Sequence, residues 1–411
     1  MKTLRYVCLL AALPAWGLAA EPENPVLASF DQVWNTVRQR HWDKQKVGEA
    51  WDRARAELRP LAELAKSAQE VRPILQKLLD MLGESHFGVI PAEAYAQLNG
   101  GSAEEAEPAF DIRVLDGQAV VTRGAGDVKG GWILERIGER EIAALVAKAK
   151  AVASGEREAK LIGYAVIHRY MKGAPGAAKV MTFLDGENQL HTVTVPFAAQ
   201  PHMVQFGNFP PFSMEVEHAV RNGIGYFRFN TFFDPEFLQQ ELSLTIADCG
   251  DCKGFILDLR GNMGGIVGLA ASTAAWFVPK QDKLGTVISQ TGKSNLVVFP
   301  RPNGFHGKLA VLVDALSVSS AEFLAAGLKD LGRARLFGEQ TQGAALPSLI
   351  EKLPDGDRFQ FAVADYISAA GAAVEGAGVM PDVAVRPTRN DYLDGRDPVM
   401  DAARKWIFSK E

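Results

Sequence analysis

Three zones of the chain differ in the spacing of their hydrophobic residues. Between residues 26 and 82, apolar side chains recur at i, i+3, i+4 and i+7, which predicts amphipathic helices packed as a small bundle. Between about 106 and 198 the pattern changes to short alternating runs, which predicts β-strands with a hairpin around DGENQ. From residue 218 onward apolar strands alternate with helices, which predicts an α/β core with a largely parallel sheet.

The predicted core has two distinctive strand ends. Its strands are expected in GIGYFRFNTF, GFILDLRG, KLAVLVD and RARLFGE, and its helices at 235–248, at 265–277 and after Ser319. Chemistry on parallel sheets gathers at the carboxyl ends of the strands. The two ends that carry unusual sequence are the serine turn VSS and the glycine turn in LDLRGNMGG.

Ser319 has two interpretations. The run from Ser319 to Glu322 spells S-x-x-E, a capping box that requires no catalytic role. A serine at a strand-to-helix turn is also a position for a nucleophile, because the free N–H groups and the positive end of the helix dipole face an oxyanion. These residues alone leave both interpretations open.

The glycine turn and the nearest lysine both bear on whether Ser319 can act as a nucleophile. Gly261, Gly264 and Gly265 let the backbone turn tightly and bring N–H groups close to a developing oxyanion. The nearest downstream lysine, Lys329, lies ten positions along the helix that follows Ser319, at a distance of roughly 15 Å. A Ser-Lys pair within this helix is therefore excluded.

Composition and the N-terminal residues narrow the class of protein. Residues 1–20 combine Lys2 and Arg5 with a short apolar run and small residues, the pattern of a secretory signal peptide. Removing them changes the net charge from -5 to about -7, which disfavours nucleic-acid binding. No later stretch is apolar enough to span a membrane, so we expect a soluble periplasmic or secreted protein.

Two cysteines remain after residue 20, in the sequence ADCGDCKGF. Cys249 and Cys252 have the spacing of a local disulfide in an oxidising compartment, and a redox-active pair is the alternative. There is no second cysteine pair to complete a zinc site, and we expect no metal.

Four segments carry a resemblance to a known family. FILDLRGNMGG, VLVDALSVSSAEFLAAGLKDLGRARLFGEQTQG, VEGAGVMPDV and GRDPVMDAA follow, in order and spacing, the pattern of the C-terminal processing (tail-specific) serine proteases. The resemblance covers most of the chain after the signal peptide. It implies an N-terminal helical subdomain over 21–100, a PDZ-like domain over 106–198 and a crotonase-like (ClpP/crotonase) α/β protease core over 199–411. Within the second region, GGWILERIGEREI resembles the strand and turn before the PDZ helix.

The resemblance also implies site residues. The family nucleophile falls on Ser319, whereas the lysine base of the main branch falls on Ala344, which removes the Ser-Lys mechanism. The tricorn-like branch uses a Ser-His pair near the N-terminus and a glutamate near the C-terminus, and these match Ser85, His86 and Glu375. A neutral imidazole can take the serine proton and return it to the leaving amine.

The family pattern places the oxyanion donors at the N–H of Gly264 or Gly265 and at that of Ser320. Adjacent residues of an extended segment point in opposite directions, so Ser85 and His86 need a bend in order to cooperate. Asp258 and Arg260 are expected to form a structural ion pair around the glycine turn. The other histidines are interpreted as structural: His41, His168, His191, His202, His218 and His306.

These features predict an exported serine endopeptidase that hydrolyses unfolded or flexible polypeptides through an acyl-enzyme on Ser319, with His86 as general base and no cofactor. The alternative is a catalytically inactive peptide-binding or scaffold protein on the same fold, which the absent lysine favours. A third reading, a small-molecule acyl hydrolase or ligand carrier, depends on fold analogy alone. The sequence does not determine the physiological substrate or the oligomeric state.

Overall fold

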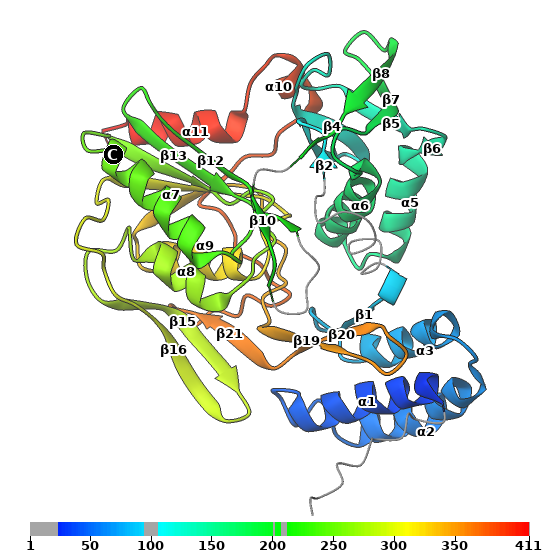
Figure 1. Ribbon diagram of the computed structural model, residues 1–411. Coiled ribbons are helices and arrows are strands. Elements are labelled where there is room, and N and C mark those ends of the chain that lie inside the picture. The colour runs from blue at the N-terminus through cyan, green and yellow to red at the C-terminus, as the bar shows by residue number, and fades with distance from the viewer. Residues whose placement is uncertain (1–23, 94–105, 200–201, 207–211, 411) are drawn as a thin grey trace, which may run out of the picture.

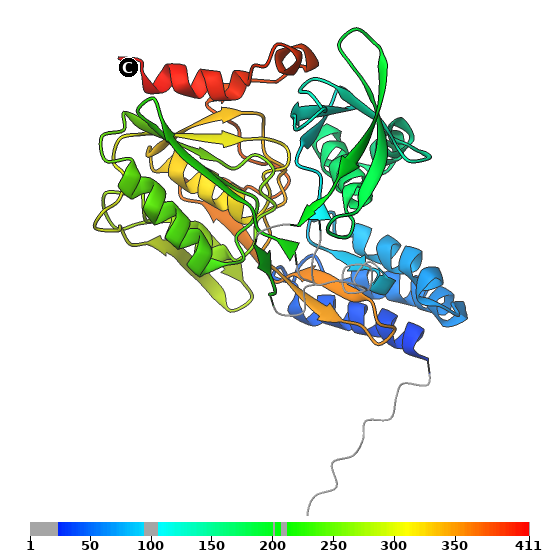
Figure 2. The same ribbon diagram turned by 45° about the horizontal axis from the view of Figure 1, so that its top comes forward.

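The chain has a helical part, an inserted β-rich part and a larger α/β part, and the largest hydrophobic cluster of each part is separate from those of the other two (Figures 1 and 2). The computed structural model describes residues 24–93, 106–199, 202–206 and 212–410. The predicted signal peptide, residues 1–20, lies outside the described residues. Within the described ranges, none of the helices combines the length and the apolar character needed to cross a membrane.

The helical part confirms the predicted bundle. It consists of α1 (Pro25–Arg40), α2 (Glu49–Leu64) and α3 (Ala68–Asp80). Asn24 and Ser67 cap α1 and α3 by accepting backbone N–H bonds, and the apolar stripes bury Phe30, Trp51 and Leu75.

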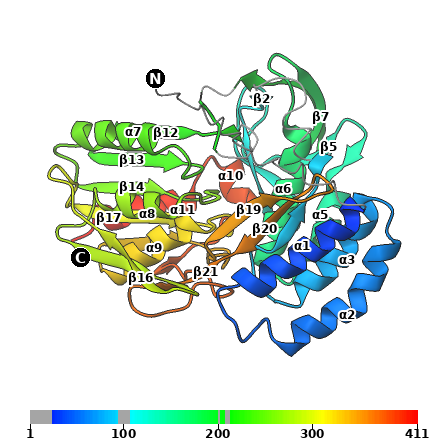
Figure 3. The same cartoon turned by 60° about the horizontal axis from the view of Figure 1, so that its bottom comes forward.

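The helical bundle also packs against a hairpin that comes from the opposite end of the sequence. Its core includes Leu353, Phe359 and Phe361, which belong to or flank β19 (Ser348–Lys352) and β20 (Arg358–Ala362). Figure 3 shows this hairpin beside α1 and α3. β1 (Gly88–Ile90) pairs with β20, so the segment just before β1 is held against the α/β part.

The inserted part is a sheet covered by two helices. Its strands are β2 (Ala106–Glu107), β3 (Asp111–Leu115), β4 (Gln118–Arg123), β5 (Ile133–Ile137), β6 (Arg140–Glu141), β7 (Ala178–Leu184), β8 (Leu190–Pro196) and β9 (Ala198–Ala199), and its helices are α5 (Ile142–Val152) and α6 (Glu156–Met171). The main sheet has the order β3-β4-β5-β7-β8. The predicted hairpin around DGENQ is confirmed, with Leu184 paired to Leu190.

The α/β part confirms the predicted parallel sheet. The strand order is β12 (Val216–Arg221), β13 (Ile224–Phe229), β14 (Gly254–Asp258), β17 (Lys308–Val313), β18 (Ala334–Gly338) and β22 (Val383–Ala384), and only the β12–β13 pair is antiparallel. The remaining elements are α7 (Pro235–Asp248), α8 (Val267–Ala274), α9 (Ser320–Asp330), α10 (Arg389–Leu393), α11 (Pro398–Ile407), β10 (Met203–Val204), β11 (Phe212–Ser213), β15 (Asp282–Ser289), β16 (Gly292–Val298) and β21 (Ala364–Ser368).

Both faces of this sheet are covered, which explains why its strands are apolar throughout. Along β17, Leu309 and Val311 face the core that contains α7, α8 and α9, whereas Ala310 and Leu312 face α11 (Figure 1). Strands β14 and β17 are neighbours and run parallel, with Asp258 opposite Leu312. Their carboxyl ends therefore bring the glycine turn and the serine turn together.

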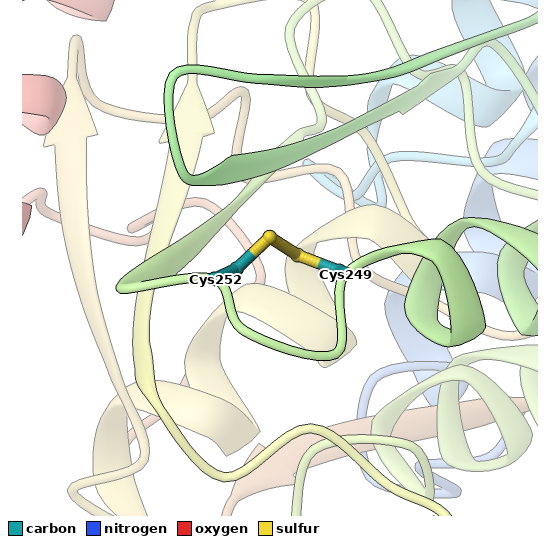
Figure 4. Close-up of a disulfide and its surroundings, with 2 residues drawn as sticks. All are labelled: Cys249 and Cys252. Atoms are coloured by element: carbon teal, nitrogen blue, oxygen red, sulfur yellow. A yellow bond between two sulfur atoms is a disulfide. The ribbon is translucent and has the colours of Figure 1, made fainter.

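Cys249 and Cys252 form a disulfide that closes the connection between α7 and β14 (Figure 4). Cys249 is the C-cap residue of α7, and the Cys252 N–H donates to the Cys249 carbonyl at 3.2 Å. The local disulfide suggested by the C-x-x-C spacing is thus formed in the structure.

We predict that the ion pair between Arg72 and Asp357 stabilises the contact between the helical part and the β19–β20 hairpin. Both Asp357 oxygens accept from Arg72 at 2.7 Å, and the Asp357 side chain is fully buried. Asp357→Ala leaves a largely buried guanidinium without this partner and should lower the free energy of unfolding by about 3 kcal/mol. Urea unfolding measures this change.

The matched control is Asp52→Ala, which removes the exposed partner of Arg38. Because both of those side chains are more than a third exposed, the control should cost less than about 1 kcal/mol. Equal effects of the two substitutions would contradict the role given to Asp357.

Candidate active site

Ser319 lies at the junction of the serine turn and α9, with a strained backbone. Its φ is 56° and its ψ is -119°, a conformation that a side-chain-bearing residue rarely adopts. Gly264 makes room for this turn, because a Cβ on Gly264 would lie 2.7 Å from the Ser319 Cβ. The Glu322 half of the capping box predicted from S-x-x-E is present, because the Ser319 N–H donates to Glu322 Oε2 at 3.1 Å, and Ser319 is thus both the N-cap residue of α9 and a residue held in an unusual conformation.

The Glu322 carboxylate holds the serine turn against the segment 341–344. It is fully buried and accepts four hydrogen bonds: from Ser319 N at 3.1 Å, Thr341 Oγ1 at 2.6 Å, Gly343 N at 2.7 Å and Ala344 N at 3.0 Å. Burial raises the pKa of Glu322 to about 7, and the four donors oppose that shift by favouring the ionised form. A carboxylate surrounded only by donors binds these two segments together.

In the glycine turn, some backbone N–H groups lie beside Ser319 without an acceptor in the described part of the chain, and others donate hydrogen bonds within the turn. The Gly264 N–H donates to Asn262 Oδ1 at 2.9 Å, and the Asn262 amide donates to the Phe229 carbonyl at 2.9 Å. Among the described residues, the backbone N–H groups of Gly265 and Ser320 have no hydrogen-bond acceptor. These two groups flank Ser319 and are therefore available to a ligand.

Ser85, His86 and Glu375 form one hydrogen-bonded chain. The Ser85 hydroxyl donates to Glu375 Oε2 at 2.9 Å and lies 2.7 Å from His86 Nδ1. Glu375 Oε1 also accepts from the Ser85 backbone N–H at 2.7 Å. Because the hydroxyl has one proton and gives it to Glu375, Nδ1 must donate to Ser85, which leaves Nε2 as the unprotonated nitrogen.

The required bend between Ser85 and His86 is present. His86 has a φ of 60°, so its ring turns back onto the Ser85 hydroxyl instead of pointing to the opposite side of the chain. Burial lowers the pKa of His86 to about 4 and raises the pKa of Glu375 above its ordinary value. At neutral pH the imidazole is therefore neutral, as a general base requires.

The backbone of Ala344 and Ala345 joins this chain to the serine turn. The Ser319 N–H donates to the Ala344 carbonyl at 2.9 Å, and the Ala345 N–H donates to Glu375 Oε2 at 2.8 Å. Within the part of the chain that the structure describes, His86 and Ser319 are not hydrogen-bonded directly to each other. The two candidate catalytic groups are thus connected through the 344–345 peptide.

A buried pair that sequence reasoning missed supports the Ser85–His86 turn. His41 Nε2 lies 2.8 Å from Glu84 Oε2, both side chains are almost completely buried, and Lys46 binds the other Glu84 oxygen. Burial opposes ionisation of Glu84, but the hydrogen bonds from His41 and Lys46 hold its pKa below the ordinary value. The His41 ring also stacks on Phe87, with centroids 5.4 Å apart.

The only sequence signal for this pair was the adjacency of Glu84 to Ser85. His41 stands at the end of α1, more than forty residues earlier, and helical periodicity does not connect it to the site.

The predicted Asp258–Arg260 ion pair is confirmed at 2.7 Å, with Asp397 as a second partner of Arg260. Within the described ranges, no group of three His, Cys, Asp or Glu side chains is arranged to hold a metal ion.

Comparisons with known proteins found similarity to proteases. Residues 223–385 match peptidase family S41, and residues 22–80 match the tricorn protease C1 domain. The chloroplastic C-terminal processing peptidase of Tetradesmus obliquus is 24% identical over 395 residues, which are 92% of this chain and 80% of that protein. The carboxy-terminal processing protease CtpA of Bacillus subtilis is 26% identical, over 39% of this chain and 35% of that one.

Solved structures show the same fold at low identity. The photosystem II D1 C-terminal processing protease superimposes with a TM-score of 0.57 at 18% identity and covers 93% of this chain and 97% of its own. The tricorn protease superimposes with a TM-score of 0.52 at 19% identity, covering 93% of this chain and 36% of its own. The chain therefore contains a serine peptidase domain of family S41 over residues 223–385, with a mixed α/β fold shared with these proteases.

Proposed function

We propose that this protein is an exported serine endopeptidase that cleaves unfolded or flexible polypeptides, with Ser319 as nucleophile and His86 as general base. The observation that carries the proposal is the hydrogen-bonded chain from Glu375 through Ser85 to His86, joined to Ser319 by the 344–345 peptide. Ala344 occupies the position of the lysine base in the main branch of the family, so an imidazole has to supply that function. Export is inferred from residues 1–20 alone.

The same proposal extends to the architecture. The parallel sheet with α7, α8 and α9 on one face is interpreted as a crotonase-like core, and the inserted sheet with its two helices as a PDZ-like domain. The domain limits are those expected from the sequence: 21–100, 106–198 and 199–411.

In the first half of the reaction, the Ser319 oxygen attacks the scissile carbonyl while His86 Nε2 takes the hydroxyl proton. The tetrahedral oxyanion accepts hydrogen bonds from the N–H groups of Gly265 and Ser320, which have no other acceptor among the described residues. We assign Gly265 in preference to Gly264 because Asn262 already accepts from the Gly264 N–H. His86 then gives its proton to the leaving amine, and an acyl-enzyme forms.

In the second half, water attacks the ester carbon and His86 takes the water proton. The Ser319 oxygen leaves with that proton, and the second product is a carboxylic acid. Throughout both halves Ser85 and Glu375 fix the imidazole tautomer and stabilise its protonated form. For the proton transfers, His86 Nε2 has to come within hydrogen-bonding distance of the Ser319 hydroxyl.

We predict that a fluorophosphonate probe labels the wild-type protein and that Ser319→Ala abolishes labelling. The matched control is Ser243→Ala on α7, whose hydroxyl donates to the carbonyl of Gln240 and should be dispensable. His86→Ala should lower cleavage of a flexible peptide by at least 100-fold, since general base catalysis is lost. Absence of labelling in a folded wild-type protein would instead support the catalytically inactive scaffold.

We predict an unusually low acid limb in the pH dependence of kcat/KM. Because burial lowers the pKa of His86 to about 4 from 6.5, the base stays neutral as pH falls through 6.5 and is lost only when pH approaches 4. Activity on a flexible peptide should therefore persist at pH 5.5, where an unperturbed histidine would be about 90% protonated. An acid limb centred at 6.5, in protein shown by circular dichroism to be folded, would contradict this prediction.

We predict that His41 acts through Glu84 as a positioning residue for the Ser85–His86 turn. His41→Ala should lower kcat on the order of tenfold with little change in KM, because the imidazole is displaced while the substrate contacts remain. His41→Gln, which can still donate to Glu84, should restore part of the loss.

The matched control for this experiment is His218→Ala, whose partner Glu241 lies on α7, in a partly exposed ion pair. A purely structural role for His41 would be indicated if His41→Ala lowered the urea midpoint but left kcat unchanged. Steady-state kinetics and urea unfolding on the same preparations distinguish these outcomes.

A further inference from the structure

A cavity of about 700 Å³ lies between the inserted part and the α/β part, next to the glycine turn. From the α/β part it is lined by Thr231, Phe233 and Met263, the last of which directly precedes Gly264. From the inserted part it is lined by Phe110 and Tyr164. A polypeptide held at Ser319 therefore has a large, partly aromatic space within reach of its side chains.

The basic side chains of this cavity are engaged in ion pairs. The pairs are Arg228 with Asp111 at 3.0 Å, Arg123 with Glu217 at 2.7 Å, Arg113 with Asp314 at 2.9 Å and Lys172 with Glu107 at 3.3 Å. His168 also lies 3.3 Å from Glu107, and burial lowers its pKa. The cavity walls therefore offer little uncompensated positive charge.

The carboxylate of Glu215 differs from these groups. Among the described residues, it has no hydrogen-bond donor and no ion-pair partner, although it lines the cavity. Burial raises the pKa of Glu215, the charges of Asp111 and Glu107 add to that effect, and the more weakly acting charges of Arg228 and Arg123 oppose it. An anion in this position is stabilised by a cation that enters from outside.

The backbone of Glu215 is fixed relative to the glycine turn. Its N–H donates to Asn230 Oδ1 at 2.9 Å, and its carbonyl accepts from the Asn230 N–H at 3.3 Å. The Asn230 carbonyl in turn accepts from the Met263 N–H at 3.0 Å. The carboxylate thus belongs to the same rigid network as the N–H groups that flank Ser319.

We propose that Glu215 binds the cationic side chain of a lysine or arginine in the substrate polypeptide, and that this cavity is its binding site. The inference depends on the proposed peptidase function and specifies the substrate class of that site. The ammonium or guanidinium pairs with Glu215, while the aliphatic stem lies along Phe110, Tyr164 and Phe233. The ion pairs along the wall keep the other acidic groups occupied, so selectivity for the cation comes from Glu215.

The test measures binding separately from cleavage by using full-length Ser319→Ala protein. Fluorescein-labelled ten-residue peptides carry a single lysine at each position in turn, and each has a partner with norleucine, which keeps the stem and lacks the charge. Fluorescence anisotropy gives the Kd values. At one or more positions the lysine peptide should bind about tenfold more tightly than its norleucine partner.

Three further variants are built on Ser319→Ala. Adding Glu215→Gln should remove the lysine preference and leave norleucine binding unchanged. Adding Glu215→Lys should reverse it, so that a glutamate peptide binds more tightly than the lysine peptide. The matched control adds Glu236→Gln on α7, an exposed carboxylate outside the cavity, and should keep the preference.

Equal binding of lysine and norleucine peptides at every position, or a lysine preference that survives Glu215→Gln, would overturn the assignment of Glu215. Neither result bears on whether Ser319 is a nucleophile. Failure of the fluorophosphonate probe to label wild-type protein would overturn the peptidase proposal instead. The two proposals therefore fail by different observations.

Discussion

Two carboxylates, the buried Glu322 and the partly buried Glu375, hold the backbone of residues 341–345 between them, and the rest of the site depends on this arrangement. Glu322 accepts hydrogen bonds from the N–H groups of Gly343, Ala344 and Ser319. Glu375 accepts hydrogen bonds from the N–H groups of Ala345 and Ser85. A carboxylate is costly to bury unless donors surround it, and the donors here come from segments far apart in the chain. The desolvation of each carboxylate is offset only when all of these segments are in place. The same hydrogen bonds therefore stabilise the fold and position the candidate catalytic groups.

The two candidate catalytic residues also share backbone strain. Ser319 and His86 both have positive φ values although neither is glycine. Conformations of this kind cost about 1 to 3 kcal/mol and persist only where surrounding contacts determine them. Glu322 supplies those contacts for Ser319, and the buried pair of Glu84 with His41 supplies them beside His86. The helical part is thereby a support for the imidazole as well as a packing element.

The inserted part also reaches the site directly. Arg113 on β3 donates to Asp314 at 2.9 Å, and the other Asp314 oxygen accepts from the N–H groups of Gly261 and Leu316. One carboxylate at the end of β17 thus contacts the glycine turn, the serine turn and a cation from the insert. The cavity beside Glu215 lies at the same junction, so the proposed substrate contacts and the proposed oxyanion donors share one framework.

The sequence by itself determined the local elements of this protein. Hydrophobic periodicity predicted the helical bundle, the hairpin around DGENQ, the parallel sheet and the capped start of α9, because burial of one face or one stripe imposes a short repeat on neighbouring residues. Family resemblance added Ser85, His86, Ser319 and Glu375 as candidates. Only the tertiary structure decided that Asn262 takes the Gly264 N–H and that His41 supports Glu84, whereas the contact of Ser85 with a glutamate 290 positions away is one that the resemblance had implied. Such contacts produce no periodic pattern in the sequence, since they depend on how separate elements pack and on which buried polar groups then find a partner.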